Sequence, residues 1–184
     1  MPEEQKHTLT GLTQGTSYNI SYYSINKKIE KSVIDSILAV IDSSMSLYKP
    51  YSLINKFNNS KQGVEIDDKF RIVLKKSLQV YDDTQGLFDI TIAPLVQAWG
   101  FGVKEIDDYP TPSAIETIKK CIGSNLLKLN GSHLIKAKPC VKIDMNGIAQ
   151  GYTVDVVADY LLDRGITRFV VEIGGELRIK WNKT

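Results

Sequence analysis

The fold is decided by the stretch from Val141 to Trp181, which reads VKIDMNGIAQGYTVDVVADYLLDRGITRFVVEIGGELRIKW. The apolar run at 141–143 predicts a short strand, and the small residues of 144–151 predict a turn after it. A helix is predicted over 153–163, because apolar residues recur there at helical spacing. Its inward-facing positions are Val156, Val157, Tyr160 and Leu161.

The second half of the same stretch predicts two further strands. Gly165 ends the helix, and residues 168–173 form the first strand. Residues 176–181 form the second strand, after the pair Gly174-Gly175. A strand, a helix and a strand within so short a span indicate a crossover unit packed on a sheet.

The preceding sequence adds a strand and a helix near the N-terminus. Residues 17–25 alternate as a half-buried strand does, with Tyr18, Ile20 and Tyr22 on one face. Apolar residues then recur at helical spacing from Val33 to Ile41. This helix is expected to end near Tyr48, because Pro50 disfavours helix in the residue before it.

The middle of the chain predicts two capped helices and a hairpin. Asp67 is expected to cap one helix, and Thr111 followed by Pro112 to cap the next. Residues 126–136 predict a β-hairpin, and Asn130-Gly131 suits the positive φ angles of a type I′ turn.

The whole chain is therefore predicted to have an α+β (mixed α/β) fold, a sheet with packed helices. Its 184 residues suffice for a single domain, and residues 1–12 are expected to form a disordered or extended tail. The net charge of +2 argues against a general binder of polyanions, so any affinity for phosphate has to be local.

The sequence has no apolar run that approaches the roughly 20 residues of a membrane helix. The segment Met1–Thr10 lacks the apolar core of a signal peptide, so an exported parent protein is expected to have lost its signal here. Cys121 and Cys140 have no CxxC partner, which argues against a zinc site. The favoured interpretation is two buried thiols, and the alternative is one disulfide.

The first candidate site is the segment DMNGIAQG at 144–151, which follows a predicted strand and opens a helix. The exposed N–H groups and the dipole of a helix N-terminus favour phosphate. Gly147 and Gly151 allow a ligand to approach the backbone, and Asp144 is placed to hold a ribose hydroxyl, a flavin ring nitrogen or a metal. A plain tight turn is the alternative.

Two further segments could bind a planar ring. In GLFDITIAPLVQAWGFG at 86–102, the aromatic residues Phe88, Trp99 and Phe101 could stack on a ring while Asp89 accepts its hydrogen bonds. The alternative for each aromatic residue is a place in the core. In MSLYKPYSLINKFN at 45–58, expected as a polar loop, Tyr48 could line the pocket, with a surface turn as the alternative.

Asp155, Asp159 and Asp163 are spaced four apart and share a helical face. A row of carboxylates could bind divalent cations, but a solvated face is the favoured interpretation except for Asp155, which lies close to the candidate phosphate site. Neither histidine has the neighbours of a catalytic triad.

These segments, in this order, resemble the ApbE-type flavin transferase family from Gly15 to Lys180. The matching pieces are GTSYNISYY, MSLYKPYSLINKFN, GLFDITIAPLVQAWGFG, DMNGIAQGYTVDVVADYLLDRGI and VVEIGGELRIK. The resemblance implies an enzyme that uses FAD and Mg²⁺, releases AMP and places the FMN phosphate on a threonine or serine of an acceptor protein. Some members are FAD pyrophosphatases instead, and many are periplasmic or lie on the outer face of the cytoplasmic membrane, held by an N-terminal lipid anchor.

The resemblance also implies roles for individual residues. Those implied to bind the cofactor are Gln14, Tyr48, Leu87, Phe88, Asp89, Asp144 and Gln150. Gly147 would offer its backbone carbonyl to the metal, Asp155 matches the acid of the family's GY-x-x-D piece and is a possible catalytic residue, and Gly174-Gly175 match its glycine turn.

Two departures from the family pattern are visible. Gln150 stands where many members have lysine, so this side chain can hydrogen-bond to a pyrophosphate but cannot neutralise it. Family members also continue beyond the GGELRIK strand, with an aspartate and a threonine as metal ligands and a histidine implicated in catalysis. The chain is therefore expected to be truncated and to have little or no transferase activity by itself.

Three functions remain open at this point. The first is the flavin transferase, and the second is an FAD-binding protein or FAD pyrophosphatase without protein transfer. The third is a nucleic-acid module, which the low net charge disfavours. It would use Tyr22, Tyr23, Lys27, Lys28 and Lys31.

Overall fold

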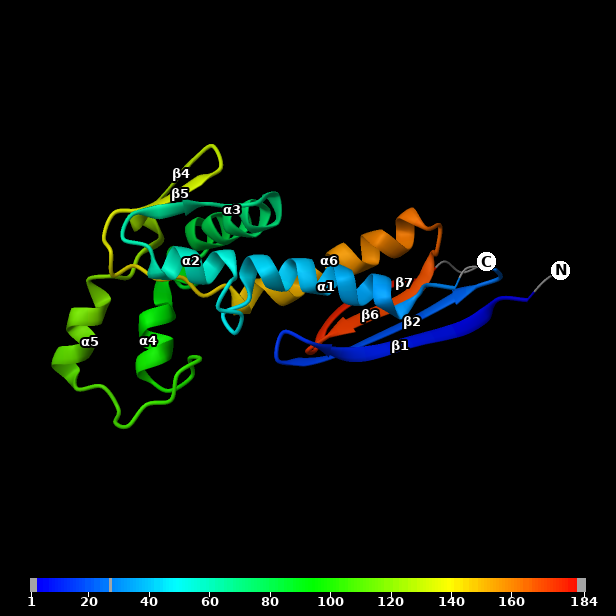
Figure 1. The fold of residues 1–184 in the computed structure, drawn as a ribbon, viewed down its shortest axis with the longest axis horizontal. Coiled ribbons are helices and arrows are strands. Elements are labelled where there is room, and N and C mark those ends of the chain that lie inside the picture. The colour runs from blue at the N-terminus through cyan, green and yellow to red at the C-terminus, as the bar shows by residue number, and fades with distance from the viewer. Residues whose placement is uncertain (1–2, 27, 182–184) are drawn as a thin grey trace. The chain divides into compact units, whose positions relative to one another are not determined.

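The computed structural model describes residues 3–26 and 28–181. The chain divides into two compact units (Figure 1). Unit 1 comprises Met1–Asp42 and Ile148–Thr184, and unit 2 comprises Ser43–Gly147.

Unit 1 is built on a four-stranded sheet in the order β1-β2-β6-β7, with every neighbouring pair of these described strands antiparallel. The strands are β1 (Gln5–Thr13), β2 (Thr16–Ser24), β6 (Arg168–Ile173) and β7 (Glu176–Trp181). The tail expected over residues 1–12 thus contains most of β1, whose backbone is extended and paired with β2.

Two helices cover one face of this sheet: α1 (Lys31–Met45) and α6 (Asn146–Asp163). The alternation of β2 buries Tyr18, Ile20 and Tyr22 as predicted, and they pack in one cluster with apolar residues of both helices and of β6. Such burial of apolar surface is the main contribution to the stability of the unit. α6 ends at Asp163, and Gly165 follows that end as the sequence predicted, with its N–H donating to the Leu162 carbonyl at 2.7 Å.

Unit 2 is helical, with a small antiparallel sheet in the order β3-β5-β4. Asp67 and Thr111 cap α3 and α5 as predicted, accepting from the N–H groups of Phe70 and Ala114. The helices and strands that lie wholly within this unit are α2 (Leu53–Asn59), β3 (Gly63–Glu65), α3 (Asp68–Asp83), η1 (Ile90–Ile92), α4 (Ala93–Ala98), α5 (Pro112–Lys119), η2 (Ser124–Leu126), β4 (Leu127–Asn130) and β5 (His133–Lys136).

The hairpin β4–β5 has its turn one residue later than predicted. Asn130 pairs with His133, so the two central residues are Gly131 and Ser132. Gly131 has φ +61°, whereas neither Asn130 nor Ser132 has a positive φ angle. The predicted type I′ turn at Asn130-Gly131 is therefore wrong, because that type needs a positive φ angle at both central residues, whereas a glycine at the first central position alone suits type II′.

The segment 45–58, predicted as a loop, contains most of helix α2. Ser52 caps this helix by accepting from the N–H of Asn55, a cap that the loop prediction overlooked. The turn predicted over 144–151 is also wrong, because α6 already begins at Asn146. Gly147 and Gly151 have no positive φ angle and continue the helix.

Residues 141–143 form no strand, so the predicted crossover unit is wrong as well. The side-chain amide of Asn58 takes the place of a neighbouring strand. Its Nδ2 donates to the Ile143 carbonyl at 2.9 Å, and its Oδ1 accepts from the Ile143 N–H at 2.8 Å. This extended segment therefore satisfies its backbone through a side chain rather than through a ladder.

The cysteines are joined by a disulfide, Cys121–Cys140, so the favoured interpretation of two buried thiols is wrong and the alternative is confirmed. In the part of the chain that the structure describes, no helix is both long enough and apolar enough to cross a membrane.

Candidate functional site

The residues that the sequence singled out lie in both units, and each set is described by itself. Unit 2 contains Tyr48, Leu87, Phe88, Asp89, Asp144 and Gly147, and unit 1 contains Gln14, Gln150 and Asp155.

Asp144 stands directly before α6 and is held at both its backbone and its side chain. Its N–H donates to the Ile90 carbonyl at 2.8 Å, and its Oδ1 accepts from the N–H of Asn146, the first helical residue, at 2.8 Å. Burial raises the pKa of this carboxyl, and the bond from Asn146 opposes the rise. A half-buried carboxyl at a helix start is well placed to hydrogen-bond a polar ring.

Phe88 and Gly147 are neighbours in the structure, although 59 positions separate them in the sequence. A Cβ placed on Gly147 would lie 3.5 Å from Cε2 of Phe88, so the glycine leaves the edge of that ring open. Gly147 lies inside α6, where helical bonding uses one of the lone pairs of its carbonyl.

Asp89 organises a loop. Its Oδ1 accepts from the N–H and the hydroxyl of Thr91, at 2.8 and 2.7 Å, and from the Ser124 hydroxyl at 2.8 Å. Its Oδ2 accepts from the Ser124 N–H at 3.2 Å. The carboxylate that was predicted to accept hydrogen bonds from a ring is thus already bonded at both oxygens. Oδ2 has more capacity than Oδ1 to accept a further hydrogen bond.

Several large apolar side chains near these residues face solvent. Tyr48 is 57% exposed, Leu87 is 94% exposed, and Phe101 is 81% exposed. Trp99 is also exposed, so a place in the core is the wrong interpretation for both Trp99 and Phe101. Exposed rings of this kind are available to stack on a planar ligand.

In unit 1, Gln14 lies in the tight turn between β1 and β2. Both turn residues have positive φ angles, +52° at Gln14 and +75° at Gly15. The Gln14 amide donates from Nε2 to the Thr153 hydroxyl at 2.8 Å, while its Oε1 is buried and has no hydrogen-bond partner among the described residues. A non-glycine residue held in this conformation, with an unpaired buried oxygen, is a candidate for ligand contact.

Gln150 lies against the glycine turn between β6 and β7. A Cβ on Gly174 would come within 2.6 Å of the Gln150 Nε2, and Gly174 has φ +58°. Only glycine fits both conditions. The structure thus brings Gln150 to the turn that the sequence matched to the family's GGE piece.

Asp155 is ion-paired with β7. Arg178 Nη1 lies 3.0 Å from Oδ1 of Asp155 and 2.9 Å from Oδ1 of Asp159, so two members of the carboxylate row share one guanidinium. Asp163 is exposed. Among residues 3–26 and 28–181, no group of three or more His, Cys, Asp or Glu residues is arranged to hold a metal ion.

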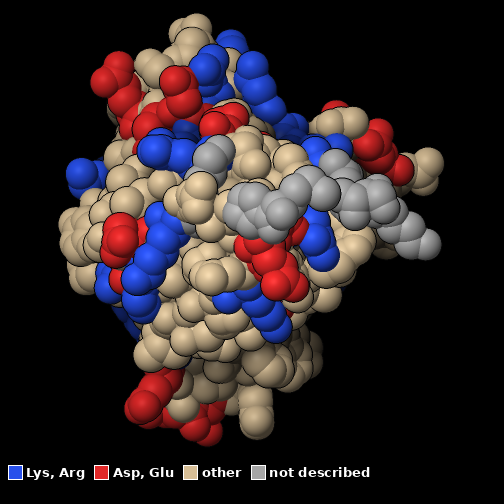
Figure 2. All heavy atoms as spheres, turned by 90° about the vertical axis from the view of Figure 1, so that its right-hand side faces the viewer, with Lys and Arg blue, Asp and Glu red and all other residues tan. Residues whose placement is uncertain are grey.

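Three of the described residues proposed for nucleic-acid binding are buried or engaged with other side chains. Tyr22 is buried, Tyr23 packs on Arg168, and Lys31 is ion-paired with Asp35. Lys27 lies outside the described residues. On the face shown in Figure 2, Lys and Arg are interspersed with Asp and Glu, which is not the surface of a phosphate-backbone binder.

Three residues that hold Gln14 and Asp89 in place were not predicted from the sequence: Thr153, Thr91 and Ser124. All three are buried polar residues. The available signal for Thr153 was its position on the apolar face of a predicted helix. Thr91 follows Asp89 by two residues, the spacing at which an aspartate accepts from the backbone in an Asx turn, whereas Ser124 had no such signal because it lies 35 positions from Asp89.

Comparison with known proteins gives a consistent result. A model of the ApbE family matches residues 14–183. An FAD:protein FMN transferase of Vibrio cholerae is 37% identical over 186 aligned residues, which cover 97% of this chain and 55% of the relative. One from Haemophilus influenzae is 35% identical, covering 94% of this chain and 54% of the relative. The chain thus spans about half the length of these curated relatives.

Solved structures show the same fold. The flavin transferase ApbE from Vibrio cholerae superposes with a TM-score of 0.92 at 34% identity, covering 98% of this chain and 60% of that one. The flavinyl transferase ApbE of Pseudomonas stutzeri, in its apo form, gives 0.91 at 31% identity, covering 98% and 62%. With the family model matching nearly the whole length, this chain belongs to the ApbE family.

Proposed function

We propose that this chain is part of an FAD:protein FMN transferase. The observation that carries the proposal is the 37% identity over 97% of the chain to a relative of that name. In the proposed reaction, the hydroxyl oxygen of an acceptor threonine or serine attacks the FMN-side phosphorus of FAD. The pyrophosphate P–O bond breaks, AMP leaves, and the hydroxyl proton is released.

In unit 2, three side chains would contact the flavin ring: the exposed Tyr48 and Leu87, and Phe88 beside Gly147. Asp144 would hydrogen-bond the flavin from the start of α6. Asp89 would act mainly by framing the segment with its backbone, because its carboxylate already bonds Thr91 and Ser124. These roles suit a pocket that combines apolar walls with a few placed polar groups.

In unit 1, Gln14 and Gln150 are proposed as neutral ligands of the cofactor. The unpaired Oε1 of Gln14 is free to accept a bond, and the Gln150 amide can donate to a phosphate oxygen. A neutral amide does not offset the charge of a pyrophosphate, so charge stabilisation has to come from other groups. Asp155 remains a candidate catalytic residue, tied to β7 by Arg178.

Magnesium is part of the proposal for the longer protein, where it would stabilise the charge that develops on the phosphates. The described residues do not by themselves make a magnesium site. Gly147 offers one carbonyl, whereas magnesium requires six oxygen ligands in near-octahedral geometry. We therefore expect little or no transfer by the 184-residue chain alone, and rates typical of the family from a longer protein that contains it.

We also propose that the protein works outside the cytoplasm, in the periplasm or on the outer face of the cytoplasmic membrane, held by a lipid anchor. The Cys121–Cys140 disulfide supports an oxidising compartment. Fractionation of cells that express the longer protein, with thiol trapping before lysis, tests this. Recovery from the cytoplasm with both cysteines reduced would contradict it.

The first test of function is a titration of FAD into the purified chain, followed by flavin fluorescence with and without Mg²⁺. Saturable quenching supports a flavin site in these 184 residues. Tyr48→Ala is expected to raise the Kd for FAD about tenfold, as loss of one aromatic contact would. Tyr51→Ala is the matched control, because Tyr51 is similarly exposed and is assigned no contact.

The second test incubates the longer protein with FAD, Mg²⁺ and an acceptor protein, and measures AMP and flavin bound covalently to the acceptor. Both products together support the transferase. AMP with free FMN and no labelled acceptor favours the pyrophosphatase alternative. The proposal is overturned if the folded protein fails to bind FAD and forms neither AMP nor a labelled acceptor.

A further inference from the structure

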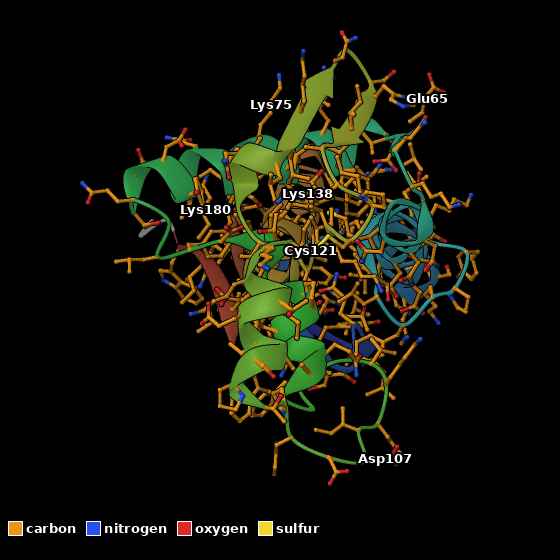
Figure 3. The ribbon with its side chains drawn as sticks, turned by 90° about the vertical axis from the view of Figure 1, so that its left-hand side faces the viewer. Glu65, Lys75, Asp107, Cys121, Lys138 and Lys180 are labelled. Carbon is orange, nitrogen blue, oxygen red and sulfur yellow. A yellow bond between two sulfur atoms is a disulfide. The ribbon has the colours of Figure 1, made fainter. Side chains whose placement is uncertain are left out.

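The disulfide Cys121–Cys140 joins two loops of unit 2 (Figure 3). The first loop follows α5, and the second precedes Val141. The Lys138 ammonium bonds the Lys120 carbonyl beside the bridge at 2.7 Å. Cys140 is exposed, so a reductant in solution can reach it.

The first loop ends on two bonds to the segment that carries Asp89. Two residues beyond Cys121, the Gly123 N–H donates to the Thr91 hydroxyl at 2.7 Å. Ser124 then donates to Asp89 from both its N–H and its hydroxyl. The loop after Cys121 thus donates a hydrogen bond to each oxygen of the Asp89 carboxylate.

The second loop runs to Asp144. Four residues beyond Cys140, the Asp144 N–H donates to the Ile90 carbonyl at 2.8 Å. Between them, the Val141 carbonyl accepts from Lys136, and Asn58 holds both backbone groups of Ile143. The path from the disulfide to Asp144 is therefore bonded along its length.

Both paths meet at η1, because Ile90 lies between Asp89 and Thr91. The bonds form a closed ring that runs from the disulfide through Ser124 to Asp89 and Ile90, and back through Asp144. The disulfide closes this ring covalently. We propose that the Cys121–Cys140 bridge is a redox-controlled clamp that positions Asp89 and Asp144 for flavin binding, so that its reduction weakens the site.

The clamp rests on the proposed function, because that function supplies FAD as the ligand. Its geometry rests on the disulfide and on the hydrogen bonds of Gly123, Ser124 and Asp144. A dithiol such as dithiothreitol supplies two electrons and two protons. The S–S bond breaks, two thiols form, and the dithiol is oxidised to its cyclic disulfide. With the bridge open, the two loops lose their covalent link to each other, each is held to the segment 89–91 by its own hydrogen bonds, and local opening becomes easier. Flavin binding then has to order these loops again, which costs affinity.

The test measures the Kd for FAD of the chain in its oxidised form and after dithiothreitol, with thiol labelling to confirm complete reduction. Reduction is expected to raise the Kd about tenfold. The variant Cys121→Ser/Cys140→Ser is expected to bind like the reduced chain and to ignore dithiothreitol, which controls for effects of the reductant on the flavin.

Two further measurements separate a clamp from a bridge that only adds stability. In Ser124→Ala, which lacks the hydroxyl bond to Asp89, reduction should change the Kd less than in the wild type, because the path is already weakened. Hydrogen exchange of the reduced chain, measured at a temperature chosen so that circular dichroism shows it to be folded, should accelerate at residues 89–91, 123–124 and 144 and stay unchanged in β2 and β6.

An unchanged Kd after complete reduction overturns the clamp. So does an acceleration of exchange spread evenly over both units. If the oxidised chain fails to bind FAD, the proposed function fails for this chain, and the exchange pattern alone decides the clamp: faster exchange confined to the three segments supports it, and unchanged exchange there overturns it.

Discussion

At the scale of single residues, buried polar side chains hold backbone segments together. Lys136 is 4% exposed, donates to the Val141 carbonyl at 2.9 Å, and lies with its ammonium 4.6 Å from the centre of the Phe57 ring. Burial is the main cause that lowers the pKa of this lysine to about 8, and the like charge of Lys142 contributes to the same shift. The cation therefore holds the second loop in place at a cost in desolvation.

This lowered pKa predicts a pH dependence of stability. Between pH 8 and 10.5 the unfolded chain keeps the proton that the folded chain has lost, so folding becomes more favourable as pH rises and the gain is absent below pH 8. From pH 7 to 10, the wild type is expected to gain about 2–3 kcal/mol in free energy of unfolding over Lys136→Met. Urea denaturation at each pH measures it. Lys128→Met, in an exposed position of β4, is the control; an equal trend there would refute the assignment to Lys136.

Gly174 is a second residue whose identity is determined by its surroundings, because its φ angle and its close neighbours favour glycine. Gly174→Ala would place a Cβ 2.6 Å from Nε2 of Gln150 and 2.8 Å from Cγ2 of Thr16, at a φ angle of +58°, and is expected to lower the free energy of unfolding by about 2–3 kcal/mol. Gly175→Ala shares the positive φ angle but meets no described atom within 4 Å, so about 1 kcal/mol is expected. Equal losses in denaturation curves would show that the approach of Gln150 has no effect.

At the scale of elements, Asn58 decides the conformation of residues 141–143. Its amide imitates a neighbouring strand, which leaves an extended segment that leads to Asp144 and the start of α6. A strand in a sheet would have been held along its whole length, whereas this segment depends on one side chain and on the Lys136 bond.

Asn58→Ala is therefore expected to destabilise unit 2 by about 1–3 kcal/mol, because both backbone groups of Ile143 lose their partner. Asn59→Ala, at the exposed neighbouring position, is expected to change stability by less than about 0.5 kcal/mol. Thermal denaturation followed by circular dichroism compares the two. Similar losses for both variants would mean that helix propensity in α2, rather than the Asn58 pair, explains the effect.

At the scale of the whole molecule, the disulfide is the one covalent link in unit 2 between distant positions of the described chain. It closes a loop with a sequence separation of 19 residues. A loop of about this length restricts the unfolded chain enough to stabilise the folded one by about 3 kcal/mol.

The double variant Cys121→Ser/Cys140→Ser is expected to lower the free energy of unfolding by about 2–4 kcal/mol in the absence of reductant. Dithiothreitol should lower the stability of the wild type to that of the variant and leave the variant unchanged. Urea denaturation followed by circular dichroism measures both. A wild type that keeps its stability after complete reduction would contradict the expectation.

The sequence by itself determined the α+β class, the helices capped by Asp67 and Thr111, the glycine turn between the last two strands, and the family. These features depend on local chemistry: side-chain alternation, caps and glycines act within a few residues. Only the tertiary structure decided that Asn58 replaces a strand beside Ile143, that Cys121 bonds Cys140, and that Asp89 is held by Ser124. Each of these pairs joins residues 19 to 85 positions apart, and such contacts are set by packing, which leaves no periodic signal in the sequence.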